Sequence, residues 1–232
     1  MPGLLANVIA IIIGSLAGLF IRNGLSVRFK TMVTNAIGLS CLFIGASTAF
    51  RGLLSGNSHP VLFIISMVVG GLIGEFIDID AKLNGLGLFI ERKVGTEGFA
   101  KGFVAASLLY CVGSMAIIGS LEAGLMGNYD TLFAKSVLDG VTAVILAASY
   151  GFGVIFSSVS VFLYQGLIVL LANSVQQYMT EDAVRELSIV GGILIFAIGL
   201  DMLGIKKVKV ANFLPALVVP VMFYAVTARF LA

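Results

Sequence analysis

Charged residues are scarce in this sequence. Only 11% of the 232 residues are Asp, Glu, Lys or Arg, whereas a soluble domain carries about 25%. Hydrophobic residues make up 59% of the chain and form runs as long as a membrane-spanning helix, which needs about 20 residues. This composition excludes a soluble globule and predicts an all-α integral membrane protein. Eight such helices would use about 160 residues, which leaves no room for a separate catalytic domain.

Residue types that catalyse reactions or hold metals are also scarce. The chain has one histidine, His59, and two cysteines, Cys41 and Cys111, in apolar stretches without a CxxC pair, so neither a zinc site nor a disulfide framework is predicted. HExxH, GxSxG, GxGxxG and the Walker lysine loop are absent. The net charge of +2 is too small to indicate nucleic-acid binding. We therefore expect no enzyme activity, no catalytic residues, no metal site and no nucleic-acid partner.

The apolar runs predict about eight membrane spans, with seven as the alternative. Six runs lie at about residues 3–21, 31–50, 60–77, 102–121, 187–203 and 212–231. Residues 132–172 form an apolar stretch twice as long as one crossing needs, interrupted by Tyr150-Gly151-Phe152-Gly153. Glycines of this kind indicate a tight turn between two helices. The charged segment 79–101 has apolar residues at helical spacing, which favours an amphipathic helix in the interface.

Positively charged residues predict the orientation, because cytoplasmic loops are rich in Lys and Arg. With the N-terminus outside, ten of the 14 Lys and Arg residues fall on the inner side: Arg22, Arg28, Lys30, Lys82, Arg92, Lys93, Lys101, Lys206, Lys207 and Lys209. Merging the two helices of 132–172 would place the last three outside. Both termini are therefore expected on the extracytoplasmic side of a bacterial or archaeal plasma membrane.

A weak internal similarity predicts an inverted repeat. Residues 29–36, entering the second span, align with residues 133–140, entering the fifth span from the opposite side. A single membrane domain, 1–232, would then comprise a three-helix unit (1–78), the interfacial linker (79–101), an inverted three-helix unit (102–173) and two further helices (187–231). Secondary transporters use inverted repeats with a site at the repeat interface. The alternative is that glycine-rich runs such as 12–20 and 68–76 only allow close helix packing.

Asp139 is the clearest candidate for function, because an ionisable group inside a span costs roughly 2.5–3.5 kcal/mol and usually faces a bundle interior or an aqueous cavity. It lies about 12 Å into its span at 1.5 Å per residue, with Ser136 and Thr142 on the same helical face. This face could bind a cation, a proton or a polar solute. The alternatives are a structural hydrogen bond and an ion pair with Lys135, one turn away.

Polar residues on two other spans complete the predicted site. Asn35 is the repeat counterpart of Asp139 and follows Thr34 in the second span. The sixth span carries a polar stripe after the glycine turn, which gives the candidates Gly151, Gly153, Ser157, Ser158 and Gln165. Backbone carbonyls freed at such a turn can serve as ligands only where protein or water covers them. Helix packing by the Asn35 amide and a plain cytoplasmic hairpin are the alternatives.

Several motifs together resemble a known family. They are Asn35-Ala36-Ile37-Gly38-Leu39, Phe43-Ile44-Gly45-Ala46, Asp139-Gly140, Ala147-Ala148-Ser149-Tyr150-Gly151-Phe152-Gly153-Val154 and Tyr164-Gln165-Gly166. Over nearly the whole chain the sequence is similar to the bacterial membrane proteins of domain of unknown function 554. This resemblance implies a small multi-spanning plasma-membrane protein, described as a transporter or permease. It implies no particular substrate or catalytic residue.

These observations lead to one functional prediction. We expect a small secondary transporter that moves a small polar solute or ion, with Na+ or H+ as the candidate coupling cation and no other cofactor. Its partners would be the lipid bilayer, the solute and a second copy of the chain, because eight short helices are few for a transporter and small-residue faces can form a homodimer. A membrane scaffold whose polar groups only pack helices, and a channel, are the alternatives.

Overall fold

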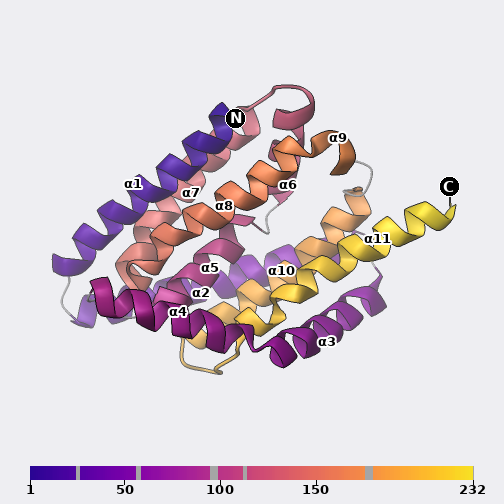
Figure 1. Ribbon diagram of the computed structural model, residues 1–232. Coiled ribbons are helices and arrows are strands. Elements are labelled where there is room, and N and C mark those ends of the chain that lie inside the picture. Colours follow the sequence, from indigo (N-terminus) through magenta and orange to yellow (C-terminus); the bar gives the residue numbers. More distant parts are fainter. Residues whose placement is uncertain (25–26, 56–58, 95–98, 112–113, 176–179, 232) are drawn as a thin grey trace.

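The computed structural model describes residues 1–24, 27–55, 59–94, 99–111, 114–175 and 180–231. This part of the chain is almost entirely helical and contains no strand (Figure 1). The helices in chain order are α1 (Pro2–Gly24), α2 (Val27–Leu53), α3 (Pro60–Ile77), α4 (Ile79–Val94), α5 (Phe99–Cys111), α6 (Ser114–Leu125), α7 (Asp130–Tyr150), α8 (Gly153–Leu170), α9 (Ala172–Val175), α10 (Glu181–Met202), the 3-10 helix η1 (Val210–Leu217) and α11 (Val218–Leu231).

Among the described residues, seven segments are long and apolar enough to cross a membrane. They are α1, α2, α3, α7, α8, α10 and the combined η1 and α11. The pair α5 and α6 makes an eighth if it is counted as one span, although the two helices are bent by 59°. The prediction of an all-α integral membrane protein with about eight spans, or seven, is thus confirmed.

The glycine turn between α7 and α8 has the predicted position. Gly151 has a φ of 81°, in the left-handed region that favours glycine, and its N–H donates to the Ala147 carbonyl at 2.9 Å. A Cβ atom at this residue would also overlap the Arg22 guanidinium. The long apolar stretch 132–172 is therefore two helices, as the length and charge arguments predicted.

Close packing of α1 on α7 forms the part of the bundle that holds the candidate site. The two helices run parallel, because Gly3 near the start of α1 lies against Leu132 and Gly18 near its end lies against Val144. A Cβ atom at Gly14 would overlap the carbonyl oxygen of Gly140, so the two backbones are in near contact. Such close approach needs small residues, and it brings the side chains of α1 and α7 into direct contact.

The remaining spans form further packed pairs of helices. α2 runs antiparallel to α10, with Gly38 against Leu203 and Gly52 against Ile189. α3 packs against η1, and α5 packs against α8. The aligned segments 29–36 and 133–140 thus lie on helices with different main partners, α10 for α2 and α1 for α7. The inverted repeat stays a prediction.

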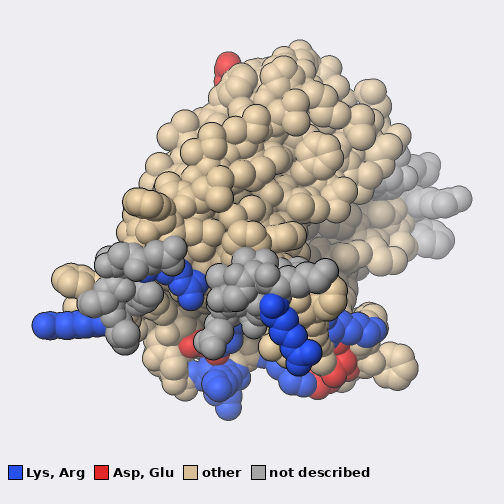
Figure 2. Space-filling view, turned by 60° about the vertical axis from the view of Figure 1, so that its left-hand side comes forward, with Lys and Arg blue, Asp and Glu red and all other residues tan. Residues whose placement is uncertain are grey.

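Charged side chains gather at one end of the bundle, at the bottom of the view in Figure 2. Two ion pairs lie at this end: Lys101 with Asp201 at 2.9 Å and Lys209 with Glu75 at 2.8 Å. The N-terminus lies at the opposite end, where the Met1 amino group donates to the Tyr129 hydroxyl (Figure 1). The basic residues and the N-terminus thus lie at opposite ends of the bundle, as the distribution of Lys and Arg in the sequence predicts. That the N-terminus lies outside the cell stays a prediction.

Candidate functional site

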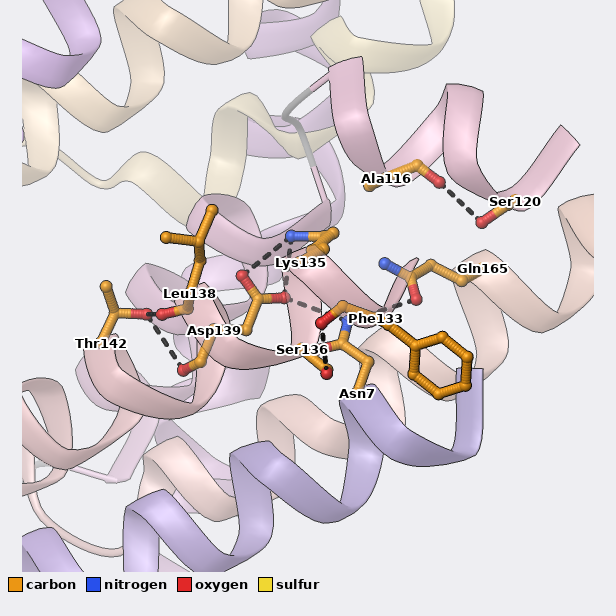
Figure 3. Close-up of polar contacts among 10 residues, drawn as sticks. All are labelled: Asn7, Ala116, Ser120, Phe133, Lys135, Ser136, Leu138, Asp139, Thr142 and Gln165. Atoms are coloured by element: carbon orange, nitrogen blue, oxygen red, sulfur yellow. Dashed lines mark hydrogen bonds and ion pairs between the residues drawn. The ribbon is translucent and has the colours of Figure 1, made fainter. Parts of the chain in front are cut away.

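Four polar side chains from three helices meet inside the bundle (Figure 3). Asn7 comes from α1, Lys135 and Asp139 from α7, and Gln165 from α8. Asn7 and Gln165 are fully buried, and Lys135 and Asp139 are 5% and 6% exposed. Asp139 is the tenth of the 21 residues of α7, so it lies near the middle of that span. We call these four residues the polar cluster.

The polar cluster is built around an ion pair. Lys135 Nζ lies 2.9 Å from Asp139 Oδ1 and 2.8 Å from Asp139 Oδ2. Asn7 Nδ2 donates to Asp139 Oδ2 at 3.0 Å and to Gln165 Oε1 at 3.3 Å. One continuous set of contacts thus joins α7 to α1 and α8, and the lysine and aspartate charges cancel.

The ionised carboxylate fixes the orientation of both amides. A carboxylate only accepts hydrogen bonds, so Asn7 must present its amide nitrogen to Asp139. That nitrogen only donates, so Gln165 must present its carbonyl oxygen to Asn7. The Asn7 Oδ1 and Gln165 Nε2 atoms are left over, one an acceptor and the other a donor. Neither has a hydrogen-bond partner in the described part of the chain.

A further polar side chain, Tyr110, lies beside the polar cluster. It is fully buried on α5, and its hydroxyl lies next to the Thr142 side chain, which offers it a hydrogen-bond partner, and near Asp139. Each buried polar atom without a partner costs about 1–3 kcal/mol, so the two unpartnered amide atoms of the polar cluster, Asn7 Oδ1 and Gln165 Nε2, need a physical explanation. An acceptor and a donor beside an ion pair are groups that a small polar species can bind.

The predicted hydroxyl ligands bond to their own helices instead. Ser136 donates to the Phe133 carbonyl at 2.7 Å, and Thr142 donates to the Leu138 and Asp139 carbonyls at 2.9 and 3.0 Å (Figure 3). On α8, Ser157 and Ser158 each donate to the carbonyl three residues earlier at 2.6 Å. Each of these hydroxyls therefore already donates its hydrogen to a carbonyl of its own helix.

The other predicted site residues lie away from the polar cluster. Gly151 lies at the turn against Arg22, and Gly153 lies against the Phe99 carbonyl, where a Cβ atom would overlap it. On α2, Asn35 is exposed on the surface of the bundle and Thr34 is partly buried. Of the ten predicted residues, the structure thus places Asp139 and Gln165 within the polar cluster, and Ser136 and Thr142 beside it on α7.

Two residues of the site were not singled out from the sequence. Asn7 is an amide within the first apolar run and Tyr110 is a hydroxyl within the fourth. A polar group in a long apolar run is a usable signal. This signal does not predict which helices contact one another, because that depends on the packing of α1, α5, α7 and α8.

A second buried carboxylate lies nearer the N-terminal end of the bundle. Glu186 on α10 is fully buried, and its Oε1 accepts the backbone N–H of His59 at 2.6 Å. This N–H belongs to the residue that precedes α3, where helices leave N–H groups without intrahelical partners. Glu186 therefore anchors α3 to α10, and His59 contributes its backbone to this contact.

The fold and the site together define a class: a multi-pass, all-α membrane protein with a cluster of buried polar side chains between α1, α7 and α8. Within that class, the chain belongs to the DUF554 family, described as "Protein of unknown function (DUF554)", which it matches over residues 2–225. The resemblance seen in the sequence motifs is confirmed.

Two relatives cover almost the same length. The chain is 36% identical over 220 residues to the "Uncharacterized membrane protein YdfK" of Bacillus subtilis (strain 168), covering 95% of this chain and 94% of that protein. It is 30% identical over 218 residues to the "Uncharacterized protein YqgA" of Escherichia coli (strain K12), covering 91% of each. No solved structure matches the chain.

Proposed function

We propose that this protein is a small secondary transporter in the plasma membrane of a bacterium or archaeon, and that the polar cluster binds the transported solute or ion. The observation that carries the proposal is the pair of unpartnered polar atoms, Asn7 Oδ1 and Gln165 Nε2, beside a buried ion pair. Polar and ionisable groups inside membrane spans are expensive, and they commonly mark substrate or ion pathways.

The chemistry of these atoms favours a small solute that both donates and accepts hydrogen bonds. Asn7 Oδ1 can accept from the solute and Gln165 Nε2 can donate to it. Because the Lys135 and Asp139 charges cancel, a neutral or zwitterionic solute adds no net charge to the bundle. Such a solute would therefore avoid the cost of an uncompensated charge in the membrane.

Ion coupling would act on the Lys135 and Asp139 pair. A proton or Na+ that binds the Asp139 carboxylate competes with the Lys135 ammonium, which lies within 2.9 Å of both carboxylate oxygens. Displacing the ammonium would change the contact between α7 and α1 through Asn7. The coupling cation and the solute are thus expected to affect each other's affinity. No step of this proposal needs a catalytic residue, a metal cofactor or a nucleic acid.

The first test is a ligand screen on the purified protein. A ligand that binds only the folded state raises stability by RT ln(1 + [L]/Kd), or about 2.7 kcal/mol at 100 Kd. We expect at least one of a panel of amino acids, small carboxylates and Na+ to raise the melting temperature and to show saturable uptake into proteoliposomes. A panel without any shift or flux would contradict the proposal. Crosslinking in membranes tests the homodimer separately.

A membrane scaffold is the second candidate, and a specific observation favours it. Asp139 is fully paired with Lys135 and Asn7, and the nearby hydroxyls of Ser136 and Thr142 bond to their own helix. In that case the polar cluster only joins α1, α7 and α8. A scaffold predicts no flux, and a second protein that co-purifies in stoichiometric amount.

A further inference from the structure

Two adjoining hollows lie on the side of α5 that faces η1 and α11. The first, which we call the head pocket, has a volume of about 240 Å3, and charged groups line it: Lys101, Lys207, Lys209, Asp80 and Asp201. The second, which we call the tail pocket, has a volume of about 410 Å3 and lies between α5, α8, α10 and the η1 and α11 segment. Val104 lines both pockets, so they share a wall.

The head pocket favours an anionic group. Its lining holds three lysines and two aspartates, and Glu75 beside Lys209 balances the third lysine. The preference for an anion therefore comes from the exposed lysines and from the basic side chains that gather at this end of the bundle (Figure 2). Lys101 and Lys209 are paired with Asp201 and Glu75, yet their side chains are 58% and 55% exposed, and Lys207 is exposed.

The tail pocket favours a hydrocarbon chain. Apolar residues such as Phe103, Leu108, Leu214 and Val221 line it, and its volume falls in the range of about 300–1,000 Å3 typical of ligand pockets. Its polar groups include Ser107 and Ser160, whose hydroxyls bond to each other at 3.0 Å. Val218 at its rim is 53% exposed, so the pocket opens to the surface that a bilayer covers.

The order of the pockets matches the shape of a phospholipid. The charged pocket lies at the end of the bundle where the basic side chains gather (Figure 2). The tail pocket follows it along η1 and α11, away from that end. A polar solute would gain nothing from the apolar walls, and basic pockets between membrane helices are a known way to bind anionic lipid heads.

We propose that the two pockets together bind one anionic phospholipid, with its phosphate in the head pocket and one acyl chain in the tail pocket. The lipid would bridge α5 and α11, which are joined by few direct contacts, and so would stabilise the bundle. The site is independent of the polar cluster and of any transported solute.

Tryptophan fluorescence provides the test, because the chain contains no tryptophan. Phe103→Trp places a reporter in the tail pocket, two residues after Lys101. Phe20→Trp is the matched control, because Phe20 is 83% exposed and lies two residues before Arg22. Both proteins are reconstituted in vesicles containing a small fraction of brominated phosphatidylglycerol or brominated phosphatidylcholine, since bromine quenches tryptophan on contact.

We expect brominated phosphatidylglycerol to quench the reporter at position 103 at least about twice as effectively as brominated phosphatidylcholine, and to show no such preference at position 20. Lys207→Gln should remove the preference, whereas Lys206→Gln should keep it, because Lys206 does not line the head pocket. Equal quenching of position 103 by the two lipids would overturn the proposal. Absence of any quenching at position 103 would also overturn the proposal, because lipid would then not reach the tail pocket. Leu214→Trp in the facing wall repeats the measurement if Phe103→Trp does not fold.

Discussion

Replacing Asp139 with Asn tests whether the buried ion pair stabilises the fold as the structure describes. Asn keeps the shape of the side chain but leaves the Lys135 ammonium, which is 5% exposed, without a countercharge. Removing one partner of a buried pair costs about 3–5 kcal/mol. Lys135 is five residues from the start of α7, so its flexible side chain can partly reach the interface. We therefore expect a loss near the lower limit, about 3 kcal/mol.

The second variant, Lys135→Met, separates the charge from the shape. Replacing both partners of a buried pair by neutral groups is often neutral or stabilising, so Asp139→Asn with Lys135→Met should lie within about 1 kcal/mol of the wild type. For a chain of this size, 1 kcal/mol corresponds to roughly 2–4 °C in melting temperature. The single Asp139→Asn variant should then melt roughly 6–12 °C lower than the wild type, and the double variant should recover most of that loss.

The assay follows thermal unfolding with a thiol-reactive fluorophore, because Cys41 is buried and Cys111 is partly buried. The matched control is the ion pair of Lys101 and Asp201 at the basic end, with a similar distance of 2.9 Å but a lysine that is 58% exposed. Exposed pairs contribute about 0–1 kcal/mol, so Asp201→Asn should have little effect. The reasoning is wrong if Asp139→Asn melts like the wild type, or if Lys135→Met fails to rescue it.

Two further predictions concern packing and orientation. Gly74→Ala should lower the melting temperature by several degrees, because a Cβ atom there would overlap the Asn212 carbonyl. Gly85→Ala should leave the melting temperature unchanged, because nothing lies within 4 Å of its Cβ position. Equal effects of the two substitutions would contradict the packing of α3 on η1. In a cysteine-free background, Asn128→Cys should react with an impermeant thiol reagent in intact cells and Lys206→Cys only after lysis, and the reverse pattern would overturn the orientation.

Much of the fold follows from local sequence properties. Span lengths, the glycine turn at Gly151 and the helix α4 depend on runs of neighbouring residues, so they can be predicted from the sequence. Asp139 was found because a charge in an apolar run is costly wherever the helix packs. Its partner Lys135 was an explicit alternative, because residues four apart share a helical face. Those predictions need no knowledge of the tertiary structure.

The partners across helices could not be predicted in this way. Asn7 meets Asp139 only because glycines let α1 approach α7 closely, and no pattern within either helix states that pairing. The serine and threonine hydroxyls are a different case, because such side chains often bond to the carbonyl three or four residues earlier. That local rule alone would have lowered the expectation for Thr142 and Ser157 as ligands.

The most direct measurement of the central claim uses Gln165→Met, which removes the unpartnered Gln165 Nε2 and the 3.3 Å hydrogen bond to Asn7. Losing an unsatisfied buried donor regains about 1–3 kcal/mol, and leaving one buried N–H of Asn7 without its acceptor costs about the same. If the polar cluster is a solute site, the variant should melt near the wild-type temperature yet lose saturable uptake and the ligand-induced shift. Ser157→Ala, whose hydroxyl bonds only to its own helix, should retain both. A Gln165→Met protein with unchanged ligand response, or one that is merely less stable, would contradict the account.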